Sequence, residues 1–204
     1  MSNPWKEVNL DIYEKHMSME SVQQLQILNE MMKEQFFTYT VKTIMILGVA
    51  GGNGLEHIGS EFDKVYGVDV NKKYLDACEN RYPNLEGIFE PICVDLLSEK
   101  LQLPCTELIV ANLLVEYIGY ECFKKVVQIT MPKHVSCIIQ INTGDSFVSD
   151  SPYIHEFDGL DVVHHQMEEK ELIRCMQDIG YEKELLLERE LPNGKKFVRI
   201  DFVK

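Results

Sequence analysis

The sequence predicts an α/β fold in which a mostly parallel β-sheet carries helices on both faces. Short apolar runs typical of buried strands alternate with stretches of helical periodicity. Several of these runs end in an acidic or amide residue. Near the end of the chain, Asn193-Gly194 separates two strand-like runs, which is the strongest short-range signal for a hairpin. The hairpin is therefore expected to add two antiparallel strands.

Composition is typical of a soluble globular protein and excludes several classes. The 204 residues are 45% hydrophobic and 26% charged, which fits one domain with an ordinary core. The net charge of −13 and the lack of basic runs argue against a nucleic-acid partner. The N-terminus has no signal-peptide core, and no apolar segment approaches the ~20 residues that span a bilayer. Six cysteines without CxxC spacing indicate reduced, mostly buried thiols. We expect a cytoplasmic protein without a membrane or nucleic-acid partner.

Two helices are expected before the first strand. Apolar residues recur at helical spacing in residues 10–17 and again after Ser18, which is predicted as the N-cap of the second helix. Both helices are consistent with packing on the sheet. Alternatively, the first covers a ligand cleft, with Tyr13 and His16 facing inwards. We divide the single domain 1–204 into an N-terminal helical cap (1–40) and a core (41–204).

The most informative stretch runs from Thr43 to Ile58. Its first apolar residues, Ile44 to Leu47, indicate a fully buried parallel strand. Four glycines follow within seven positions: Gly48, Gly51, Gly52 and Gly54. The spacing of Leu55 and Ile58 predicts a helix that starts near Asn53 or Gly54. In this arrangement the backbone can approach a ligand closely, because glycine has no Cβ and the helix N–H groups face the bound molecule.

Further strands and helices alternate along the chain. The expected strands are Lys64–Asp69, Pro91–Leu97, Leu108–Asn112 and Val135–Ile141, followed by the hairpin strands Tyr181–Leu191 and Lys196–Val203. Asn71 is predicted to cap a helix that ends near Arg81. Further helices are expected from about Tyr120 to Thr130 and from Glu169 to Ile179. Residues 143–167 are predicted as a long loop, and loops of that length are usually functional or mobile.

Two acids at predicted strand ends suit a nucleoside. Asp69 lies about twenty residues beyond the glycine loop, where a carboxylate accepts two hydrogen bonds from ribose hydroxyls. Its alternative role is that of a helix-start acid favoured by the helix dipole. Asp95 follows the third strand and could accept a hydrogen bond from an adenine amino group; its alternative is an N-cap or turn acid.

Together the glycine stretch, Asp69, Asp95, the strand ending at Asn112 and the closing hairpin resemble the class I S-adenosylmethionine-dependent methyltransferases. The resemblance runs from about Thr43 to the end of the chain. It implies a Rossmann-like sheet of seven strands, five parallel strands and a C-terminal antiparallel hairpin, with helices on both faces. It also implies that S-adenosylmethionine is the cofactor and S-adenosylhomocysteine the product. The cofactor-binding residues implied are Gly48, Val49, Ala50, Gly52 and Asn53 at the methionine, Asp69 and Val70 at the ribose, Asp95 and Leu96 at the adenine, and Asn112 and Leu113 beside the methyl donor.

Two positions depart from the family pattern. Ile46 stands where the family usually has an acid, two residues before the first glycine, so one polar contact to the methionine end is missing. Ala50 replaces the middle glycine of GxGxG. Alanine is compatible with this position if its φ is negative.

Methyl transfer from a sulfonium is an in-line displacement that needs alignment and water exclusion, and a base only when the acceptor must lose a proton. The catalytic candidates are therefore groups near the fourth strand and in the cap: Tyr13, Glu116 and Tyr117. His16 and the pair His164-His165 are further candidate bases.

Several methyltransferase subclasses are disfavoured. Asn112 is followed by Leu-Leu-Val instead of the Pro-Pro-aromatic signature of adenine-N6 and glutamine methylation. The dipeptide Pro104-Cys105 precedes the fourth strand, which argues against cytosine-C5 chemistry. Asn142 and Asp145 are the only candidates for a metal site, so none is predicted.

Three functions remain in competition. The first is a methyltransferase for a small-molecule acceptor, favoured by the compact chain and its acidic balance. The second is a non-catalytic protein that keeps the fold as a cofactor sensor or partner subunit, favoured by Ile46. The third is a nicotinamide dehydrogenase, which Ala50 disfavours because the GxGxxG fingerprint needs glycine there.

Overall fold

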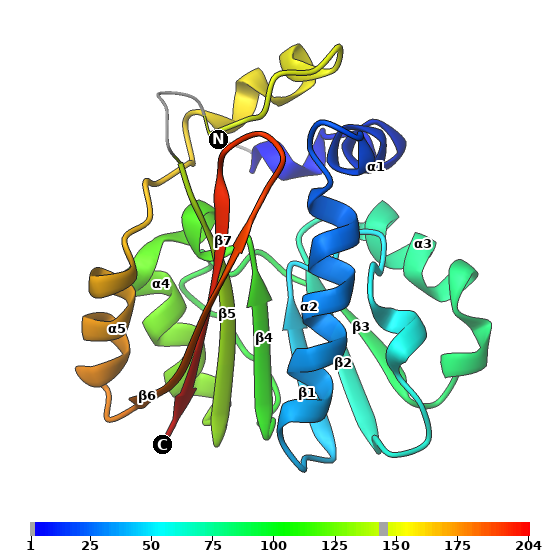
Figure 1. The fold of residues 1–204 in the computed structure, drawn as a ribbon. Helices are drawn as coiled ribbons and strands as arrows, with labels where there is room; N and C mark the ends of the chain where they lie inside the picture. The colour runs from blue at the N-terminus through cyan, green and yellow to red at the C-terminus, as the bar shows by residue number, and fades with distance from the viewer. Residues whose placement is uncertain (1–2, 143–146) are drawn as a thin grey trace.

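A computed structural model describes residues 3–142 and 147–204, and it contains one seven-stranded sheet (Figure 1). The strands are β1 (Thr43–Leu47), β2 (Lys64–Asp69), β3 (Phe89–Cys93), β4 (Leu108–Asn112), β5 (His134–Ile141), β6 (Glu182–Glu190) and β7 (Lys196–Val203). Their order is β3-β2-β1-β4-β5-β7-β6. Strands β1 to β5 are parallel, and β7 pairs antiparallel with both β5 and β6. The predicted fold class, including the closing hairpin, is confirmed.

Helices cover both faces of the sheet. They are α1 (Leu10–Ser18), α2 (Gln24–Thr38), α3 (Lys72–Arg81), α4 (Val115–Thr130) and α5 (Glu169–Gln177). Short 3-10 turns form η1 (Pro4–Lys6), η2 (Leu55–His57), η3 (Pro83–Leu85) and η4 (Ile154–Leu160). Figure 1 shows α4 and α5 on one side of the sheet and α2 and α3 on the other.

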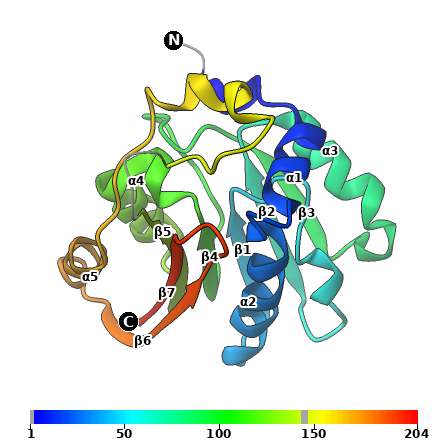
Figure 2. The same ribbon diagram turned by 45° about the horizontal axis from the view of Figure 1, so that its top comes forward.

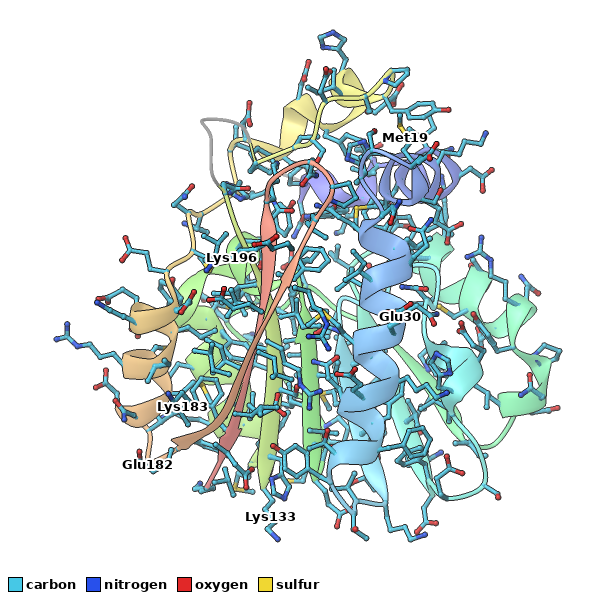
Figure 3. The ribbon with its side chains drawn as sticks, viewed as in Figure 1. Met19, Glu30, Lys133, Glu182, Lys183 and Lys196 are labelled. Atoms are coloured by element: carbon cyan, nitrogen blue, oxygen red, sulfur yellow. The ribbon has the colours of Figure 1, made fainter. Side chains whose placement is uncertain are left out.

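Alternation along the central strands builds the two halves of the core. In β1, Met45 and Leu47 pack with the side chains of α4 and α5, whereas Ile44 and Ile46 pack with those of α2 and α3. Successive strand residues point to opposite faces, so an uninterrupted apolar run is required to fill both. Charged side chains such as Glu30 on α2 and Lys133 before β5 are exposed instead (Figure 3).

The N-terminal segment and η4 lie together over the carboxyl ends of the parallel strands (Figure 2). We call residues 3–23 and 147–165 the cap. Two hydrogen bonds fasten its first residues to the core: Asn71 Nδ2 donates to the Trp5 carbonyl at 3.0 Å, and the Tyr74 hydroxyl donates to the Val8 carbonyl at 2.9 Å. The cap is thereby held over the edge of the sheet where α/β proteins bind ligands.

Local predictions were wrong at three helix boundaries. Ser18 is the last residue of α1, and α2 follows Gln23, which has a left-handed conformation. The helix expected after the glycines is only the three-residue turn η2, because the chain must reach β2 within a few residues and α2 occupies the neighbouring space. Helix α4 starts at Val115, earlier than expected, and continues across a kink at Gly119.

None of the helices in the described part of the chain is long and apolar enough to cross a membrane. All six cysteines are free. Cys78, Cys137 and Cys175 are buried, whereas Cys93 and Cys105 are exposed, so burial of the thiols is less complete than expected.

Candidate functional site

A cleft opens at the carboxyl edge of the sheet beneath the cap. This rim cavity encloses about 650 Å³ of empty space, part of it open to solvent, which is within the usual size of a ligand pocket. Its walls are mainly apolar and come from Val68, Val94, Leu96, Leu114 and Ile118. Trp5, Tyr13 and Tyr117 close it on the cap side.

Asp69 is the acid of the rim cavity. It follows β2 directly, and its two carboxyl oxygens accept hydrogen bonds from the backbone N–H groups of Ala50 at 3.0 Å and Asn71 at 2.8 Å. Burial raises the pKa of Asp69, and these backbone hydrogen bonds partly offset that rise. Asn71, which accepts from the Lys73 N–H, is the N-cap of α3. The helix-capping role is therefore filled by Asn71, and the remaining lone pairs of Asp69 are available to a ligand in the cavity.

The glycine bend alternates in conformation. Gly48, Gly52 and Gly54 have φ values of 72°, 85° and 92°, which glycine adopts without strain. Ala50 has a φ of 47°, so the expectation of a negative φ at this position is wrong. A left-handed conformation costs an L-residue roughly 1–2 kcal/mol. The Ala50 N–H points at Asp69 in this conformation, which couples the strained bend to the ribose-type acid.

A second hollow follows the other side of the bend, and we call it the bend cavity. Gly48, Val49, Ala50 and Asn53 line it, together with Ile46 and, from α1, Glu14. A carboxylate thus stands beside the bend although Ile46 replaces the acid of the family pattern. Glu14 is paired with Arg81, whose Nη2 donates to it at 2.9 Å.

Arg81 also holds the bend itself. Its Nη1 donates to the Gly51 carbonyl at 2.9 Å, so the ion pair lies across the position that a Gly51 side chain would fill. Sequence reasoning missed this contact, because Glu14 and Arg81 come from helices far apart in the chain. Gly52 does not line any of these three cavities; Leu55, Cys78 and Tyr82 cover the place of its missing side chain.

Asp95 lies just beyond β3 and forms a turn. Its carboxyl accepts from the Leu97 N–H at 3.0 Å and from Asn3 Nδ2 at 3.3 Å. The flanking residues Val94 and Leu96 line the rim cavity, as Val70 does near Asp69. The turn role is thus present in the structure, and the contact with an adenine amino group stays a prediction.

Asn112 ends β4 between the rim and bend cavities. Its amide is paired in both directions with Gln35 of α2, at 2.8 and 3.0 Å. Gln35 is fully buried and also donates to the Ser136 hydroxyl, which in turn donates to Asp201. Asp201 is paired with the buried guanidinium of Arg199. This polar network crosses the core and fixes the Asn112 side chain, and Leu113 beside it lines the rim cavity.

A third hollow, the cap cavity, lies between α4, β5 and the cap and encloses about 520 Å³, again partly open to solvent. Glu116 lines it and is 3% exposed. Glu116 Oε1 accepts from the Gln140 N–H at 3.3 Å, whereas Oε2 has no hydrogen-bond partner among the described residues. Burial raises the pKa of Glu116 to about 7. A buried carboxyl that titrates near neutrality is suited to proton transfer.

Four residues line both the rim and cap cavities: Trp5, Tyr13, Leu113 and Tyr117. Trp5 makes edge contacts with the rings of Tyr13 and Tyr117, at centroid distances of 5.8 and 4.9 Å. Burial raises the pKa of both tyrosines, so they stay protonated near neutral pH. Sequence reasoning selected Tyr13, Glu116 and Tyr117, and the structure brings these three together; it did not find Trp5.

The candidate histidines differ in position. His16 lines the cap cavity, accordingly facing inwards as Tyr13 does, and lies 2.8 Å from the Ser151 hydroxyl; burial and the nearby Lys195 lower its pKa to about 4. His164 also lines the cap cavity and stacks on Phe147. His165 is exposed, and only its backbone reaches Glu116.

Within residues 3–142 and 147–204, no group of three histidine, cysteine, aspartate or glutamate side chains could hold a metal ion. Asp145, one of the two metal candidates, lies outside the described residues.

No family model matches the sequence, and no curated protein matches it in sequence. Solved structures do match the fold. The N-methyltransferase NodS from Bradyrhizobium japonicum WM9, in complex with S-adenosylhomocysteine, is 10% identical with a TM-score of 0.69, covering 100% of this chain and 99% of NodS. The geranyl diphosphate C-methyltransferase from Streptomyces coelicolor A3(2) is 10% identical with a TM-score of 0.66, covering 89% of this chain and 81% of that enzyme.

A third match is the [4+2]-cyclase SpnF, 7% identical with a TM-score of 0.66, over 90% of this chain and 82% of SpnF. At these identities the comparisons show the fold, which is that of the class I S-adenosylmethionine-dependent methyltransferases across nearly the whole chain. Because fold alone does not specify chemistry, function must be argued from the site.

Proposed function

We propose that this protein is an S-adenosylmethionine-dependent methyltransferase that acts on a small-molecule acceptor. The observation that carries the proposal is the adjacency of two cavities with different chemistry. The rim cavity combines Asp69 with the glycine bend, whereas the cap cavity holds the buried carboxyl of Glu116. Both are bordered by Tyr13 and Tyr117, so a donor in one lies beside an acceptor in the other.

The residues present fit the cofactor. Asp69 retains lone pairs for the two ribose hydroxyls, and Val94 and Leu96 offer an apolar wall to the adenine. The amino-acid tail would follow the bend from Gly48 towards Glu14, whose carboxylate suits an ammonium group. When bound, S-adenosylmethionine supplies an activated methyl group, and the protein has to orient the acceptor and exclude water. Trp5 and the rest of the cap provide that exclusion.

Calorimetry with S-adenosylmethionine and S-adenosylhomocysteine tests the proposal directly. Replacing Asp69 by alanine removes a charged acceptor from the ribose and should weaken binding by roughly 1–3 kcal/mol. The matched control is Asp63→Ala at an exposed position before β2, which should leave the affinity unchanged. An absence of heat and of thermal shift with both nucleosides would refute the proposal, and equal affinity of the Asp69 variant would remove that residue from the site.

The second candidate is a protein that keeps this fold without methyl transfer, as a cofactor sensor or partner subunit. Two observations favour it: Ile46 at the position of the family acid, and a matching structure described as a [4+2]-cyclase. It predicts that S-adenosylmethionine binds without turnover on a broad acceptor panel. Methylation of any natural acceptor would exclude it. The six free thiols support a reducing compartment, so we include a cytoplasmic location in the proposal.

A further inference from the structure

The cap cavity contains one group that can carry a charge near neutral pH. Glu116 lines the cavity and keeps Oε2 without a donor among the described residues, although the side chain is 3% exposed. A buried carboxylate oxygen without a partner is costly, and a ligand that donates to it removes that cost. The missing partner of Glu116 is therefore a proton donor, and a cation is the best match.

The rest of the lining excludes anions. The titratable groups beside Glu116 in this cavity are the two tyrosines and the histidines His16 and His164. Burial raises the pKa of the tyrosines and lowers that of both histidines, so all four are neutral near pH 7. No lysine or arginine is among the described lining residues; the nearby Lys195 is turned away and donates to the Phe147 carbonyl. A carboxylate or phosphate would find no cation here.

Aromatic rings surround the same space. Tyr117 contacts Trp5 edge-on at 4.9 Å, and His164 lies 5.8 Å from Tyr117 and stacks on Phe147 at 3.8 Å. Phe157 closes the cavity from η4, with His16 4.8 Å away. Aromatic faces attract ammonium groups, most strongly where water is excluded. A single carboxyl within such a ring of aromatics is a typical amine site.

We infer that the cap cavity binds a small primary or secondary amine and that its nitrogen is the methyl acceptor. This deepens the proposed function and rests on it. Glu116 takes a proton from the bound ammonium, which leaves a neutral amine with a free electron pair. The nitrogen forms a bond to the methyl carbon while the carbon–sulfur bond breaks, and sulfur keeps that electron pair as a thioether. The product leaves as a methylated ammonium, and the proton on Glu116 passes to solvent.

The test compares ligands that share a shape and differ in charge: benzylamine, benzyl alcohol and benzoate, and the aliphatic set isobutylamine, isobutanol and isobutyrate. Binding is measured by calorimetry with S-adenosylhomocysteine saturating. We expect an amine of at least one set to bind at least tenfold more tightly than its alcohol, and the acids not to bind. With S-adenosylmethionine, the preferred amine should gain one methyl group on nitrogen by mass spectrometry.

The variant Glu116→Gln keeps the shape and removes the charge. It should reduce the amine-to-alcohol preference at least tenfold while the affinity for S-adenosylhomocysteine changes less than twofold. The control is Glu121→Gln, the same exchange at an exposed position of α4, which should keep the preference. An equal or better alcohol or acid, silence from both amines although S-adenosylhomocysteine binds, or an unchanged preference in Glu116→Gln overturns the inference.

Failure of S-adenosylhomocysteine to bind is a different result, because it refutes the proposed function. Amine binding measured without the nucleoside then shows whether the cap cavity is still an amine site.

Discussion

Replacing Glu116 by glutamine should change how the stability of the protein depends on pH. Burial raises the pKa of this carboxyl from its ordinary 4.5 to about 7 in the fold. Below pH 4.5 the group is protonated in both the folded and the unfolded chain, so it costs nothing. Between pH 4.5 and 7 the unfolded chain ionises and the folded one does not, so stability falls as the pH rises.

The size of this effect follows from the shift in pKa. A shift of about 2.5 units corresponds to roughly 3 kcal/mol at 1.36 kcal/mol per unit, reached fully above pH 7. Between pH 5 and pH 8 the wild type should therefore lose roughly 2–3 kcal/mol that Glu116→Gln retains. The new amide also leaves an N–H group without an acceptor, but this penalty is the same at every pH.

Urea unfolding followed by circular dichroism at pH 5, 6, 7 and 8 measures the difference. The other groups that sense the charge of Glu116 are Tyr13, Tyr117, Tyr120 and Cys137, all of which have raised pKa values and stay neutral over this range. They titrate alike in both proteins, so the difference between the two curves isolates Glu116. Parallel stability curves from pH 5 to pH 8 would show that the carboxyl is not held protonated by burial.

Two further predictions concern the bend and the core network. Ala50→Gly should be neutral or stabilise the protein by up to about 1 kcal/mol, because glycine removes the left-handed strain but adds chain entropy; the same exchange at Ala77 inside α3 should destabilise it by about 1 kcal/mol, and equal signs for the two in thermal unfolding would contradict the strain at Ala50. Gln35→Leu should destabilise the fold by roughly 1–3 kcal/mol and weaken S-adenosylhomocysteine binding, because Asn112 and Ser136 lose a buried partner; calorimetry that finds both values unchanged would contradict a positioning role for Gln35.

Much of the fold could be predicted from local patterns. The strand ends at Asp69 and Asn112 follow from short apolar runs, and the hairpin follows from Asn193-Gly194. These features depend on residues that are neighbours in the chain, so the sequence displays them directly. The helix after the bend was predicted wrongly because two apolar residues at helical spacing do not show that α2 already occupies the space.

The candidate site divides along the same line. Position relative to predicted strands was enough to select Asp69, Glu116 and Tyr117, all of which line the two cavities. For Asp95 the sequence left two roles open, and the structure shows the turn. Trp5 was missed, because nothing near the N-terminus indicates that this segment returns over the sheet edge.

The sequence by itself determined which strands form, where their polar ends lie and that a glycine-rich bend precedes the acid, because each of these is written in spacing along the chain. Only the tertiary structure decided the left-handed conformation of Ala50, the ion pair of Glu14 with Arg81 and the protonation of Glu116. Each of these three depends on contacts or burial created when distant segments meet. Electrostatic and steric energies follow distance in space, and distance along the chain does not report it.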